Sequence, residues 1–379
     1  MEKVEQDANN TDPAMVVTLV SPQDYFDINY HTFRTLVEKD KVDRQVIKFD
    51  RILHSTRFMW GRSTKVTSQH VTVAAAGIAN GQDVEIPYDV LVLCTGCRYT
   101  HGSVDYIKGP AQAATTKERK AQLLTKAEAI EKADNYNIIG GGPSTIEMAA
   151  ELLTHFPEKK VTVISKSAVM KDLNHKARAK IASFFMVHKD HVQVFEETKR
   201  SVAVKAIKTE PNQFVFTGLV PNTEFLKDNG LVQLDKDGYV VVKEGQYQVA
   251  ALAADQQVAI PGQESTDTDN DDGSGGGSEN VDNIFCFGDI AKPNAMEGDW
   301  KSGDKTSKLA RFIYENIALY VQGEPLATKK REPGGATLSL GPQDGVGSYG
   351  KFNVPVPLVV SSKSKDMGVE KIHKLLTSS

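Results

Sequence analysis

Short, almost wholly apolar runs alternate with longer amphipathic stretches along this chain. The apolar runs suit strands whose two faces are both covered, and the amphipathic stretches repeat apolar positions at the helical period. Strands are expected at 14–20, 84–94, 136–139, 161–164, 191–195, 214–217, 238–243 and 283–290, with further alternating strand material at 44–75. Helices are expected at 31–38, 115–133, from 143 onward, at 174–187 and at 308–322. This alternation predicts an α/β fold.

A glycine turn near the middle of the chain carries the clearest functional signal. The apolar strand 136–139 runs into Gly140–Gly142, and the next helix begins near Pro143 and Ser144. In a dinucleotide-binding turn the glycines allow close backbone approach to a pyrophosphate, and the helix N-terminus directs its N–H groups at it. Thr145 stands where the third glycine of that pattern would be. The flanking strand and helix favour nucleotide binding over a purely structural turn.

The end of the following strand bears on the choice between NADH and NADPH. A carboxylate near residue 165 would bind the adenine ribose hydroxyls and repel a 2′-phosphate. Ser165 and Lys166 stand there instead, so NADPH is tolerated, although a lone lysine is more often simply solvated. The candidate NAD(P)-binding residues are therefore Gly140, Gly141, Gly142, Pro143, Ser144, Thr145, Ser165 and Lys166.

Composition narrows the class of protein. The 379 residues suit two or three domains, and the 40% hydrophobic and 25% charged shares are those of a soluble globular chain. A net charge of −4 gives no case for nucleic-acid binding. No apolar run approaches the roughly 20 residues of a membrane span. Three cysteines favour a reducing compartment, hence the cytoplasm, and no metal site is predicted.

Two polar segments are expected to lack a fixed structure. Residues 1–13 form a polar, acidic leader that does not have the features of a signal peptide. Residues 261–280 include the acidic, Gly/Ser-rich run QESTDTDNDDGSGGGSEN, which cannot bury enough apolar surface to fold. We therefore expect a disordered leader and a disordered surface loop.

Three strand ends accompany the glycine turn: Thr95-Gly96, Thr217-Gly218 and Gly288-Asp289. Their order resembles the flavoproteins with two dinucleotide-binding domains, and among them the apoptosis-inducing-factor-like and ferroptosis-suppressor group of NAD(P)H:quinone oxidoreductases. The stretches that carry this resemblance are DYFDINYHTFRTLVE (24–38), EIPYDVLVLCTG (85–96), NIIGGGPSTIEMAAELLTHFPEKKVTVI (137–164), PNTEFLKDNGLVQLDKDGYVVV (221–242), IFCFGD (284–289) and LSLGPQDGVG (338–347).

The resemblance implies two Rossmann-like, three-layer domains and a small C-terminal α+β portion. The FAD-binding domain would be discontinuous, over 14–112 and 281–325, and the NAD(P)-binding domain would cover 113–260. The C-terminal portion would cover 326–379. The family's first strand, glycine turn and helix for FAD are missing, so this domain is expected to be N-terminally incomplete. Ser21 replaces its acidic ribose ligand, and the β-meander between Phe195 and Phe214 is shortened.

The resemblance also assigns residues to the two cofactors. Asp289 would bind the ribityl chain of FAD, with a helix N-cap as its structural alternative. Glu147 would lie at the nicotinamide–flavin contact, or else be an exposed helix glutamate. Lys363 would reach the flavin, or else be a solvated lysine. The candidate catalytic residues are Glu147 and Lys363, and the further cofactor-binding candidates are Thr95, Gly96, Thr217, Gly218, Gly288 and Asp289.

The function implied is FAD-dependent oxidation of NAD(P)H with electrons passed to a quinone-like acceptor. The alternative is a catalytically impaired NAD(P)-binding pseudo-oxidoreductase that has lost FAD. A thiol oxidoreductase using Cys94 and Cys97 is a third, weaker hypothesis, because a redox-active cysteine needs a stabilised thiolate. The basic C-terminus (Lys363, Lys365, Lys371, His373 and Lys374) suggests weak peripheral contact with an anionic membrane.

Overall fold

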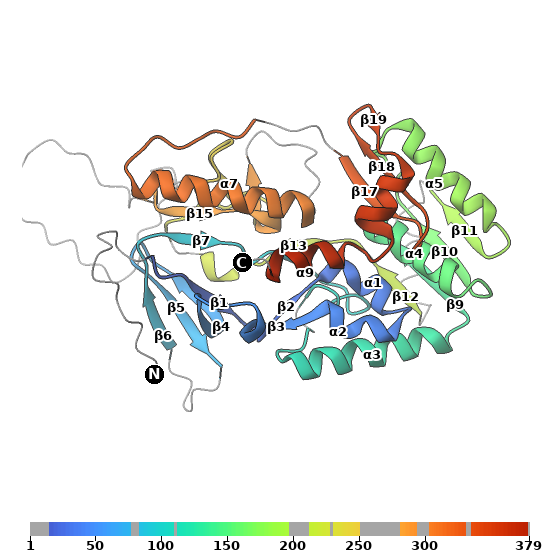
Figure 1. Cartoon of the computed structure of the whole chain (residues 1–379), viewed down its shortest axis with the longest axis horizontal. Helices are drawn as coiled ribbons and strands as arrows, with labels where there is room; N and C mark the ends of the chain where they lie inside the picture. Colours follow the sequence, from blue (N-terminus) through green and yellow to red (C-terminus); the bar gives the residue numbers. More distant parts are fainter. Residues whose placement is uncertain are drawn as a thin grey trace, which may run out of the picture.

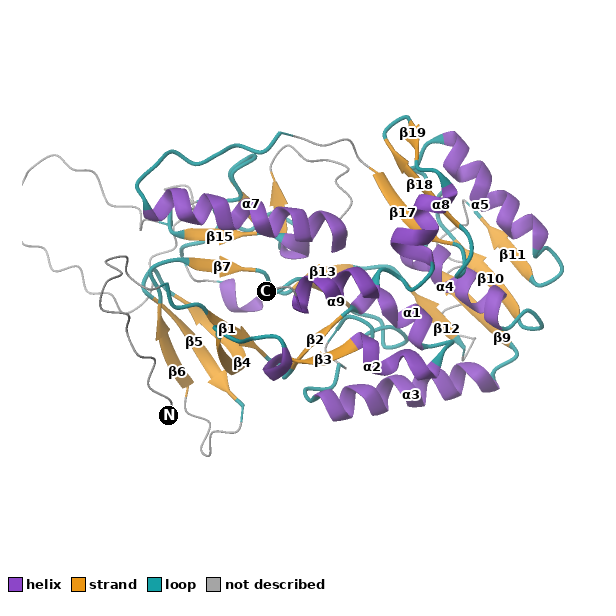
Figure 2. Cartoon of the chain, viewed as in Figure 1, coloured by secondary structure: helices purple, strands orange, loops and turns teal. Residues whose placement is uncertain are grey.

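The computed structural model describes residues 15–76, 83–109, 112–196, 212–227, 230–250, 281–293, 303–330 and 335–377. The leader at 1–13 and the acidic loop at 261–280 lie outside these residues, as does most of the segment between Phe195 and Phe214. Figure 1 shows two bodies side by side, with the C-terminal segment between and above them. Figure 2 shows helices flanking the strands of the right-hand body, whereas the left-hand body consists mainly of strands with one long helix along its upper side.

A parallel four-stranded sheet forms the centre of the body on the right of Figure 1. Its strands are β9 (Asn135–Ile139), β10 (Lys160–Ile164), β11 (Val192–Phe195) and β12 (Gln213–Val215), in the order β11-β10-β9-β12. Its helices are α3 (Thr116–Lys132), α4 (Pro143–His155) and α5 (His175–Val187). The chain order 3-2-1-4 across the sheet is that of a Rossmann half, so the expected α/β fold is confirmed.

Helix α4 is the central packing element of this body. Its sequence is apolar around most of its circumference, and Ile146, Met148, Leu152 and Leu153 are all at most 1% exposed. A helix that is hydrophobic on all sides is buried, and α4 packs against both β10 and the C-terminal strand β17 (Gly335–Ser339). The glycine turn before α4 is thereby fixed by the core on both sides.

The body on the left begins with β1 (Thr18–Ser21), which pairs in parallel with β4 (Arg57–Val66). Strands β5 (His70–Ala75) and β6 (Asp83–Pro87) continue this sheet as an antiparallel meander. The expected single strand at 84–94 is wrong. It is divided between β6 and β7 (Leu91–Leu93), which pairs in parallel with the distant β15 (Ile284–Cys286). β6 exposes alternate residues, whereas 91–93 faces the core, so one apolar run spans two environments.

Smaller elements connect the two bodies. The antiparallel ladder of β8 (Cys97–Tyr99) with β13 (Leu219–Pro221) joins segments on either side of the Rossmann half. The expected helix at 31–38 is a 3-10 turn, Asn29–His31, followed by one short α-helix. The remaining elements are α1 (Thr32–Thr35), α2 (Val42–Gln45), α7 (Gly303–Val321), β2 (Tyr25–Asp27), β3 (Val46–Lys48), β14 (Val240–Val242) and β16 (Ala291–Pro293).

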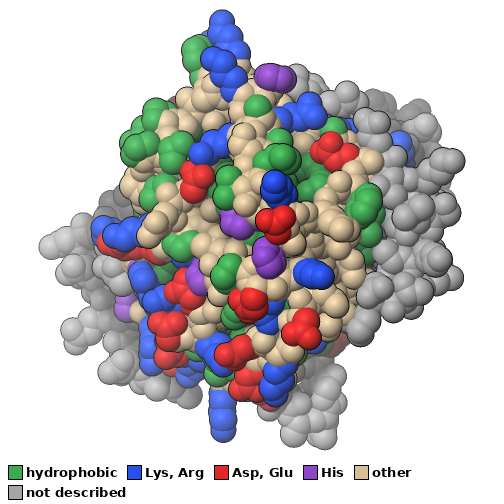
Figure 3. Space-filling view, turned by 90° about the vertical axis from the view of Figure 1, so that its right-hand side faces the viewer, with side chains coloured by type: hydrophobic (Ala, Val, Ile, Leu, Met, Phe, Trp, Pro, Cys, Tyr) green, Lys and Arg blue, Asp and Glu red, His purple; other side chains and the backbone are tan. Residues whose placement is uncertain are grey.

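The C-terminal portion is a small sheet followed by helical turns. Strands β17, β18 (Gly345–Tyr349) and β19 (Phe352–Asn353) are antiparallel. They lead to α8 (Val356–Val359), a π-helical turn at Val360–Ser364 and α9 (Val369–Thr377). Within the described ranges, no helix has both the length and the apolar character needed to cross a membrane. On the face seen in Figure 3, basic and acidic side chains are intermixed.

Candidate active site

The three glycines before α4 play different roles. Gly140 has φ +145°, and a Cβ there would lie 3.0 Å from the carbonyl oxygen of Phe216. A Cβ on Gly141 would lie 2.4 Å from Oγ of Ser165, which is a clash. A Cβ on Gly142 would meet no atom within 4 Å. The first two glycines are therefore required by packing, whereas Gly142 borders open space that a ligand can approach.

The N-terminus of α4 suits a pyrophosphate. Its N-cap is Gly142, no side chain caps it, and Pro143 occupies the first turn. The exposed N–H groups and the helix dipole favour an anion at this position. The side chain of Thr145 is fully buried and points back at Gly140, where its Oγ1 would lie 2.7 Å from an added Cβ. The turn fits a dinucleotide, with Thr145 in a supporting position.

The two candidates at the end of β10 are placed differently. Ser165 is 1% exposed, and its Oγ accepts the backbone N–H of Ser167 at 3.3 Å. Lys166 is exposed. Glu196, after the neighbouring strand, accepts the N–H of Val169 at 2.6 Å. Lys166 and Glu196 are thus the exposed side chains at the ends of β10 and β11, whereas Ser165 is buried.

The strand ends Thr95-Gly96 and Gly288-Asp289 lie together. Sγ of Cys97 donates to the carbonyl oxygen of Asp289 at 2.9 Å, and β7 and β15 are paired just before them. Gly96 has φ +70° and Gly288 has φ +78°, a conformation that favours glycine. A Cβ on Gly96 would meet nothing within 4 Å. An exposed backbone beside a carboxylate fits the sugar chain of a flavin cofactor.

Asp289 also forms an ion pair within the chain. Its Oδ2 accepts a hydrogen bond from Nζ of Lys108, and both side chains are about one-quarter exposed. An ionised carboxylate has two oxygens and about four acceptor positions. The hydrogen bond from Lys108 is accepted by Oδ2 of Asp289, and an ionised carboxylate can accept hydroxyl donors as well as an ammonium.

The strand end Thr217-Gly218 lies beside the glycine turn. The N–H of Phe216 donates to the carbonyl of Ile139 at 2.8 Å, and Gly218 lies next to Thr100 at one end of the β8·β13 ladder. The opposite end of that ladder lies next to Gly96, whose carbonyl accepts the N–H of Asn222. The two Thr-Gly turns are thus at opposite ends of one ladder.

Tyr99 connects this ladder to the glycine turn, and no motif in the sequence pointed to this residue. Its hydroxyl lies 3.0 Å from Oγ of Ser144, on the first turn of α4. Burial raises the pKa of Tyr99, so its hydroxyl stays protonated at neutral pH. Ser144 is thereby held at the N-terminus of the helix, where a nucleotide phosphate would lie.

Glu147 and Lys363 are brought together although 216 positions separate them (363 − 147). Nζ of Lys363 lies 3.3 Å from Oε1 of Glu147, and the same oxygen accepts the backbone N–H of Ser339 at 3.1 Å. Glu147 is 4% exposed, so it is not the exposed helix glutamate considered above. Burial raises the pKa of Glu147, and Lys363 and the Ser339 N–H partly oppose that effect.

Lys363 is not a solvated tail lysine either. Its side chain is 19% exposed, and its Nζ lies 4.8 Å from the centre of the Tyr30 ring. A cation over an aromatic face is stabilised by the ring quadrupole. The lysine therefore lies between an aromatic ring and the buried carboxylate of Glu147. This carboxylate is one helical turn after the glycine turn.

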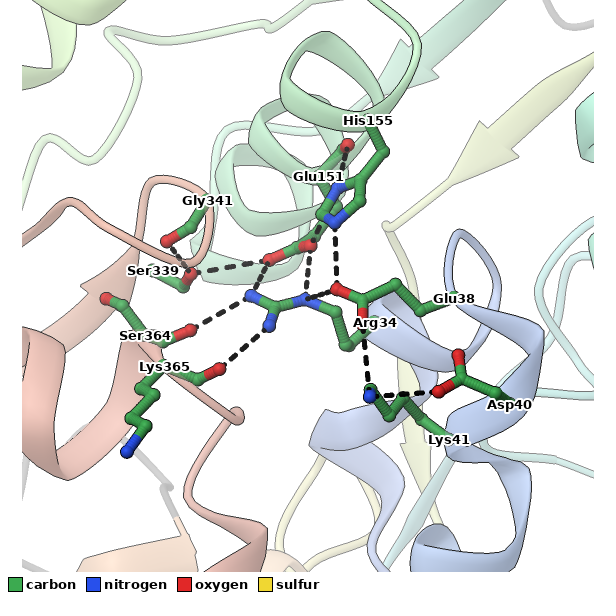
Figure 4. Close-up of polar contacts among 10 residues, drawn as sticks. All are labelled: Arg34, Glu38, Asp40, Lys41, Glu151, His155, Ser339, Gly341, Ser364 and Lys365. Atoms are coloured by element: carbon green, nitrogen blue, oxygen red, sulfur yellow. Dashed lines mark hydrogen bonds and ion pairs between the residues drawn. The ribbon is translucent and has the colours of Figure 1, made fainter.

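A second buried ion pair lies next to the first, and sequence reasoning missed it (Figure 4). Arg34 donates to both carboxylate oxygens of Glu151, Nε at 2.6 Å and Nη2 at 2.8 Å. Arg34 is 2% exposed and Glu151 is fully buried. A signal for this pair was present in the sequence: Glu147 and Glu151 are four residues apart on a largely apolar helix, so both carboxylates lie on one face.

The two cysteines of the C-x-x-C pattern are in different environments. Cys94 is exposed, whereas Cys97 is buried and engaged with Asp289. Both are free thiols. In the part of the chain that the structure describes, no three His, Cys, Asp or Glu side chains are grouped to hold a metal.

Comparison with known proteins identifies the family. A family model described as pyridine nucleotide-disulphide oxidoreductase matches residues 13–303. Ferroptosis suppressor protein 1 of Xenopus laevis is 25% identical over 376 residues, covering 94% of this chain and 88% of the relative. Apoptosis-inducing factor homolog A of Dictyostelium discoideum is 20% identical over 366 residues, covering 90% and 81%. The expected family resemblance is confirmed.

Solved structures share the fold. The sulfide:quinone oxidoreductase of Aquifex aeolicus superposes with a TM-score of 0.67 at 13% identity, covering 96% of this chain and 86% of that one. The water-forming NADH oxidase of Lactobacillus brevis, bound to NADH, gives a TM-score of 0.59 at 15% identity, covering 88% and 69%. These likenesses concern the two-domain Rossmann-like fold alone.

Proposed function

Since the chain belongs to the pyridine nucleotide-disulphide oxidoreductase family, its reaction is an FAD-dependent oxidation of NAD(P)H, and we propose that a quinone-like molecule accepts the electrons. The observation that carries the proposal is the buried pair of Glu147 and Lys363, one turn into the helix that follows the glycine turn. Two titratable groups in one water-poor site are typical of an active site.

The chain's own residues divide into those that hold each cofactor. When bound, the nicotinamide supplies a hydride and the flavin accepts it and passes electrons on. We assign the pyrophosphate of NAD(P)H to Gly140–Gly142 and the α4 N-terminus, and its adenine ribose to Ser165 and Lys166. Thr95-Gly96 and Gly288-Asp289 would hold the flavin side. Thr217-Gly218, next to the glycine turn, would line the nucleotide side.

Glu147 and Lys363 would act where the two rings meet. The buried carboxyl of Glu147 is a hydrogen-bonding group for the nicotinamide carboxamide, which would fix the orientation of the ring. The ammonium of Lys363 would stabilise negative charge that develops on the flavin ring, in a site where low polarity strengthens such interactions. The pairing of the two side chains balances their charges before a cofactor arrives.

The quinone-like acceptor is supported by the resemblance to NAD(P)H:quinone oxidoreductases in the stretches quoted above. Quinones reside in membranes, so a membrane contact would serve this reaction. The apolar side of α9, however, packs against the protein through Val369, Ile372 and Leu376, next to Ile28 and Ile47. We therefore propose a cytoplasmic protein with weak, electrostatic membrane contact through its C-terminal lysines.

The alternative, an NAD(P)-binding protein without FAD, is favoured by one observation. Lys108 already pairs with the carboxylate that the flavin sugar would use. A protein that relied on this internal pair would keep Asp289 for stability and not for a ligand. Replacing Lys108 with methionine separates the two proposals. If Asp289 binds FAD, the variant should bind FAD at least as well as the wild type does, whereas a protein without FAD should still bind none.

A visible absorption spectrum of the purified protein tests the proposal. A flavin band, present at once or gained on adding FAD, followed by its bleaching with NADH or NADPH and its return with a water-soluble quinone, would support the full reaction. Bleaching that quinone does not reverse would remove the acceptor. A protein that stays colourless with added FAD, yet binds NAD(P)H, would leave the alternative.

Variants at the pair assign the roles. We expect Lys363→Met and Glu147→Gln to slow flavin reduction about 10²-fold, the usual loss for one oriented electrostatic group. Lys365→Met is the matched control, because that neighbouring lysine contributes its backbone carbonyl, and not its ammonium, to the network. If Lys363→Met and Glu147→Gln reduce the flavin as fast as Lys365→Met does, neither residue has the proposed role.

A further inference from the structure

The segment that carries Lys363 has an unusual backbone. Residues Val360–Ser364 form a π-helical turn, and Met367 and Gly368 after it both have positive φ, 52° and 72°. A π-turn is rare and shifts the hydrogen-bond pattern by one residue. Met367 is completely buried, so this strained conformation is held by the packing around it. The placement of Lys363 therefore depends on contacts outside its own turn.

Arg34 supplies such contacts. Its Nη2 donates to the carbonyl oxygen of Ser364 at 2.9 Å, and its Nη1 donates to that of Lys365 at 3.1 Å. These two carbonyls directly follow Lys363 in the chain. The same guanidinium is clamped by Glu151, one turn after Glu147 on α4. Figure 4 shows Arg34 between the helix and the C-terminal turn.

We propose that Arg34 is a positioning residue, which locks the π-helical turn onto α4 and thereby sets Lys363 beside Glu147. One rigid, planar fork reaches a carboxylate and two carbonyls at once. Glu151 and Glu147 lie on the same face of one helix, so the Arg34 anchor and the Lys363–Glu147 contact share a common frame. The catalytic role of Lys363 rests on the function proposed above, whereas its placement by Arg34 does not.

Further polar groups surround the Arg34–Glu151 pair. Glu151 is surrounded by Arg34, by His155 with Nδ1 at 3.5 Å and by the Ser339 hydroxyl at 3.4 Å. Glu38 faces Arg34 at 3.5 Å and His155 at 2.8 Å. A buried charge pair contributes little net stability over an apolar pair. The Arg34–Glu151 pair lies against a backbone segment that is held in one conformation. Its role is therefore better explained by the positioning of that segment than by stability.

The chain contains a matched control. Arg119 and Asp27 form an ion pair of similar burial, with 0% and 8% of their side chains exposed, at a distance of 2.8 Å. Arg119 also donates to a backbone carbonyl, that of Tyr106, at 2.6 Å. Within the described residues, neither side chain forms a hydrogen bond or ion pair with the π-helical turn. Arg119→Lys therefore reproduces the loss of a buried guanidinium without touching Lys363.

The first experiment measures how accessible Lys363 is, with no cofactor needed. Protein without added FAD is treated briefly with an amine-acetylating reagent, and acetylation of Lys363 is followed by mass spectrometry. We expect Arg34→Lys to raise the labelling rate of Lys363 about tenfold through local opening of the turn. Arg119→Lys should leave it unchanged. Unchanged labelling in Arg34→Lys would overturn the proposal.

Glu151→Gln keeps the test decisive if Arg34→Lys does not fold. This variant keeps an acceptor for the guanidinium but removes the charge that clamps it, so a smaller rise in Lys363 labelling is expected. Labelling as slow as in the wild type would again count against placement by Arg34.

The second experiment links placement to the reaction in FAD-loaded protein. We expect Arg34→Lys to slow flavin reduction about tenfold in the wild type, the cost of a small misplacement. In Lys363→Met it should slow the reaction less than about twofold, because the residue it positions is gone. Equal slowing in both backgrounds would overturn the proposal. If Lys363→Met alone leaves the rate unchanged, the function proposed for Lys363 fails, whereas the labelling result still reports on Arg34.

Discussion

At the scale of single residues, several titratable side chains next to the candidate site are buried without being part of the proposed chemistry. His31 follows Tyr30 directly and is 1% exposed. Burial, together with the charge of Arg34, lowers the pKa of His31 from 6.5 to about 3. The ring is therefore neutral in the folded protein at every pH at which the enzyme would work.

His31 makes the fold sensitive to acid. The unfolded chain gains a proton at His31 below pH 6.5 and the folded chain does not until about pH 3. Its contribution to stability is complete above pH 6.5 and is lost as pH falls toward 3, by up to about 1.4 kcal/mol per pH unit. The free energy of unfolding should therefore decrease between about pH 7 and pH 5. We expect this decrease to be about 2 kcal/mol smaller in His31→Leu than in the wild type.

Urea unfolding at the two pH values measures this effect. His54→Leu is the control, because His54 is exposed and its removal should leave the difference between the two pH values unchanged. A pH dependence that is identical in the wild type and in His31→Leu would show that His31 is not the acid-sensitive group.

Lys166 governs the choice of nucleotide in our assignment. Its exposed ammonium at the end of β10 is placed to attract a 2′-phosphate. We expect Lys166→Glu to weaken NADPH binding about tenfold relative to NADH, because a carboxylate there repels the phosphate. Titration of both nucleotides, followed by fluorescence quenching, gives the ratio.

Lys189→Glu is the charge-matched control for this prediction. Lys189 precedes β11 and therefore lies near the N-terminal ends of the parallel strands, whereas the ligand is expected at their C-terminal ends. Lys189→Glu should leave the ratio of the NADPH and NADH affinities unchanged. A similar loss of NADPH preference in both variants would mean that net charge, and not position 166, is responsible.

At the scale of elements, the C-terminus of α3 is closed by a buried lysine. Nζ of Lys159 donates to the carbonyl oxygens of Ile130, Glu131 and Ala133, at 3.1, 2.6 and 2.7 Å. Lys159 is 5% exposed. A cation at this end of a helix compensates both its terminal carbonyls and its dipole. The loop before β10 thereby fixes α3 against the sheet.

We expect Lys159→Met to destabilise the fold by about 2–3 kcal/mol, because three carbonyls lose a charged donor in a buried position. Lys160→Met should change stability by less than about 0.5 kcal/mol, since Lys160 is exposed. Thermal unfolding of the two variants provides the comparison. Equal effects would indicate that hydrogen bonds to Lys159 are replaced by water at no cost.

At the scale of the whole molecule, the C-terminal portion contacts both the Rossmann half and the smaller elements that connect the two bodies. β17 packs on α4 of the Rossmann half, whereas α9 packs on Ile28 and Ile47 of the N-terminal part. Figure 1 shows α9 in the middle of the view. The segment with Lys363 lies between these two attachments, so docking of α9 also restrains the candidate site.

Docking of α9 can be tested at two neighbouring positions. Ile372 packs toward Ile28 and Ile47, whereas Leu375 is 52% exposed. We expect Ile372→Asp to release α9 and to raise amide exchange over 369–377 at least about tenfold, because a charge cannot be buried there. Leu375→Asp should leave the exchange unchanged. Slow exchange in both variants would show that α9 is held by other contacts.

Most elements were predictable because their signals are local. The helical period at 115–133 and 174–187 and the apolar runs at 136–139 and 161–164 needed no knowledge of their neighbours. The division of 84–94 into β6 and β7 was not predictable. Both halves have strand-forming residues, and only pairing with 284–286 separates them.

The α/β class and a glycine turn shaped for a dinucleotide follow from the amino-acid sequence, since helix period, strand length and glycine spacing act over a few residues. The tertiary structure alone decided which side chains face one another. Glu147, Ser339 and Lys363 meet only because the C-terminal portion folds back onto α4. Arg34 joins them through backbone carbonyls, whose direction no residue type encodes.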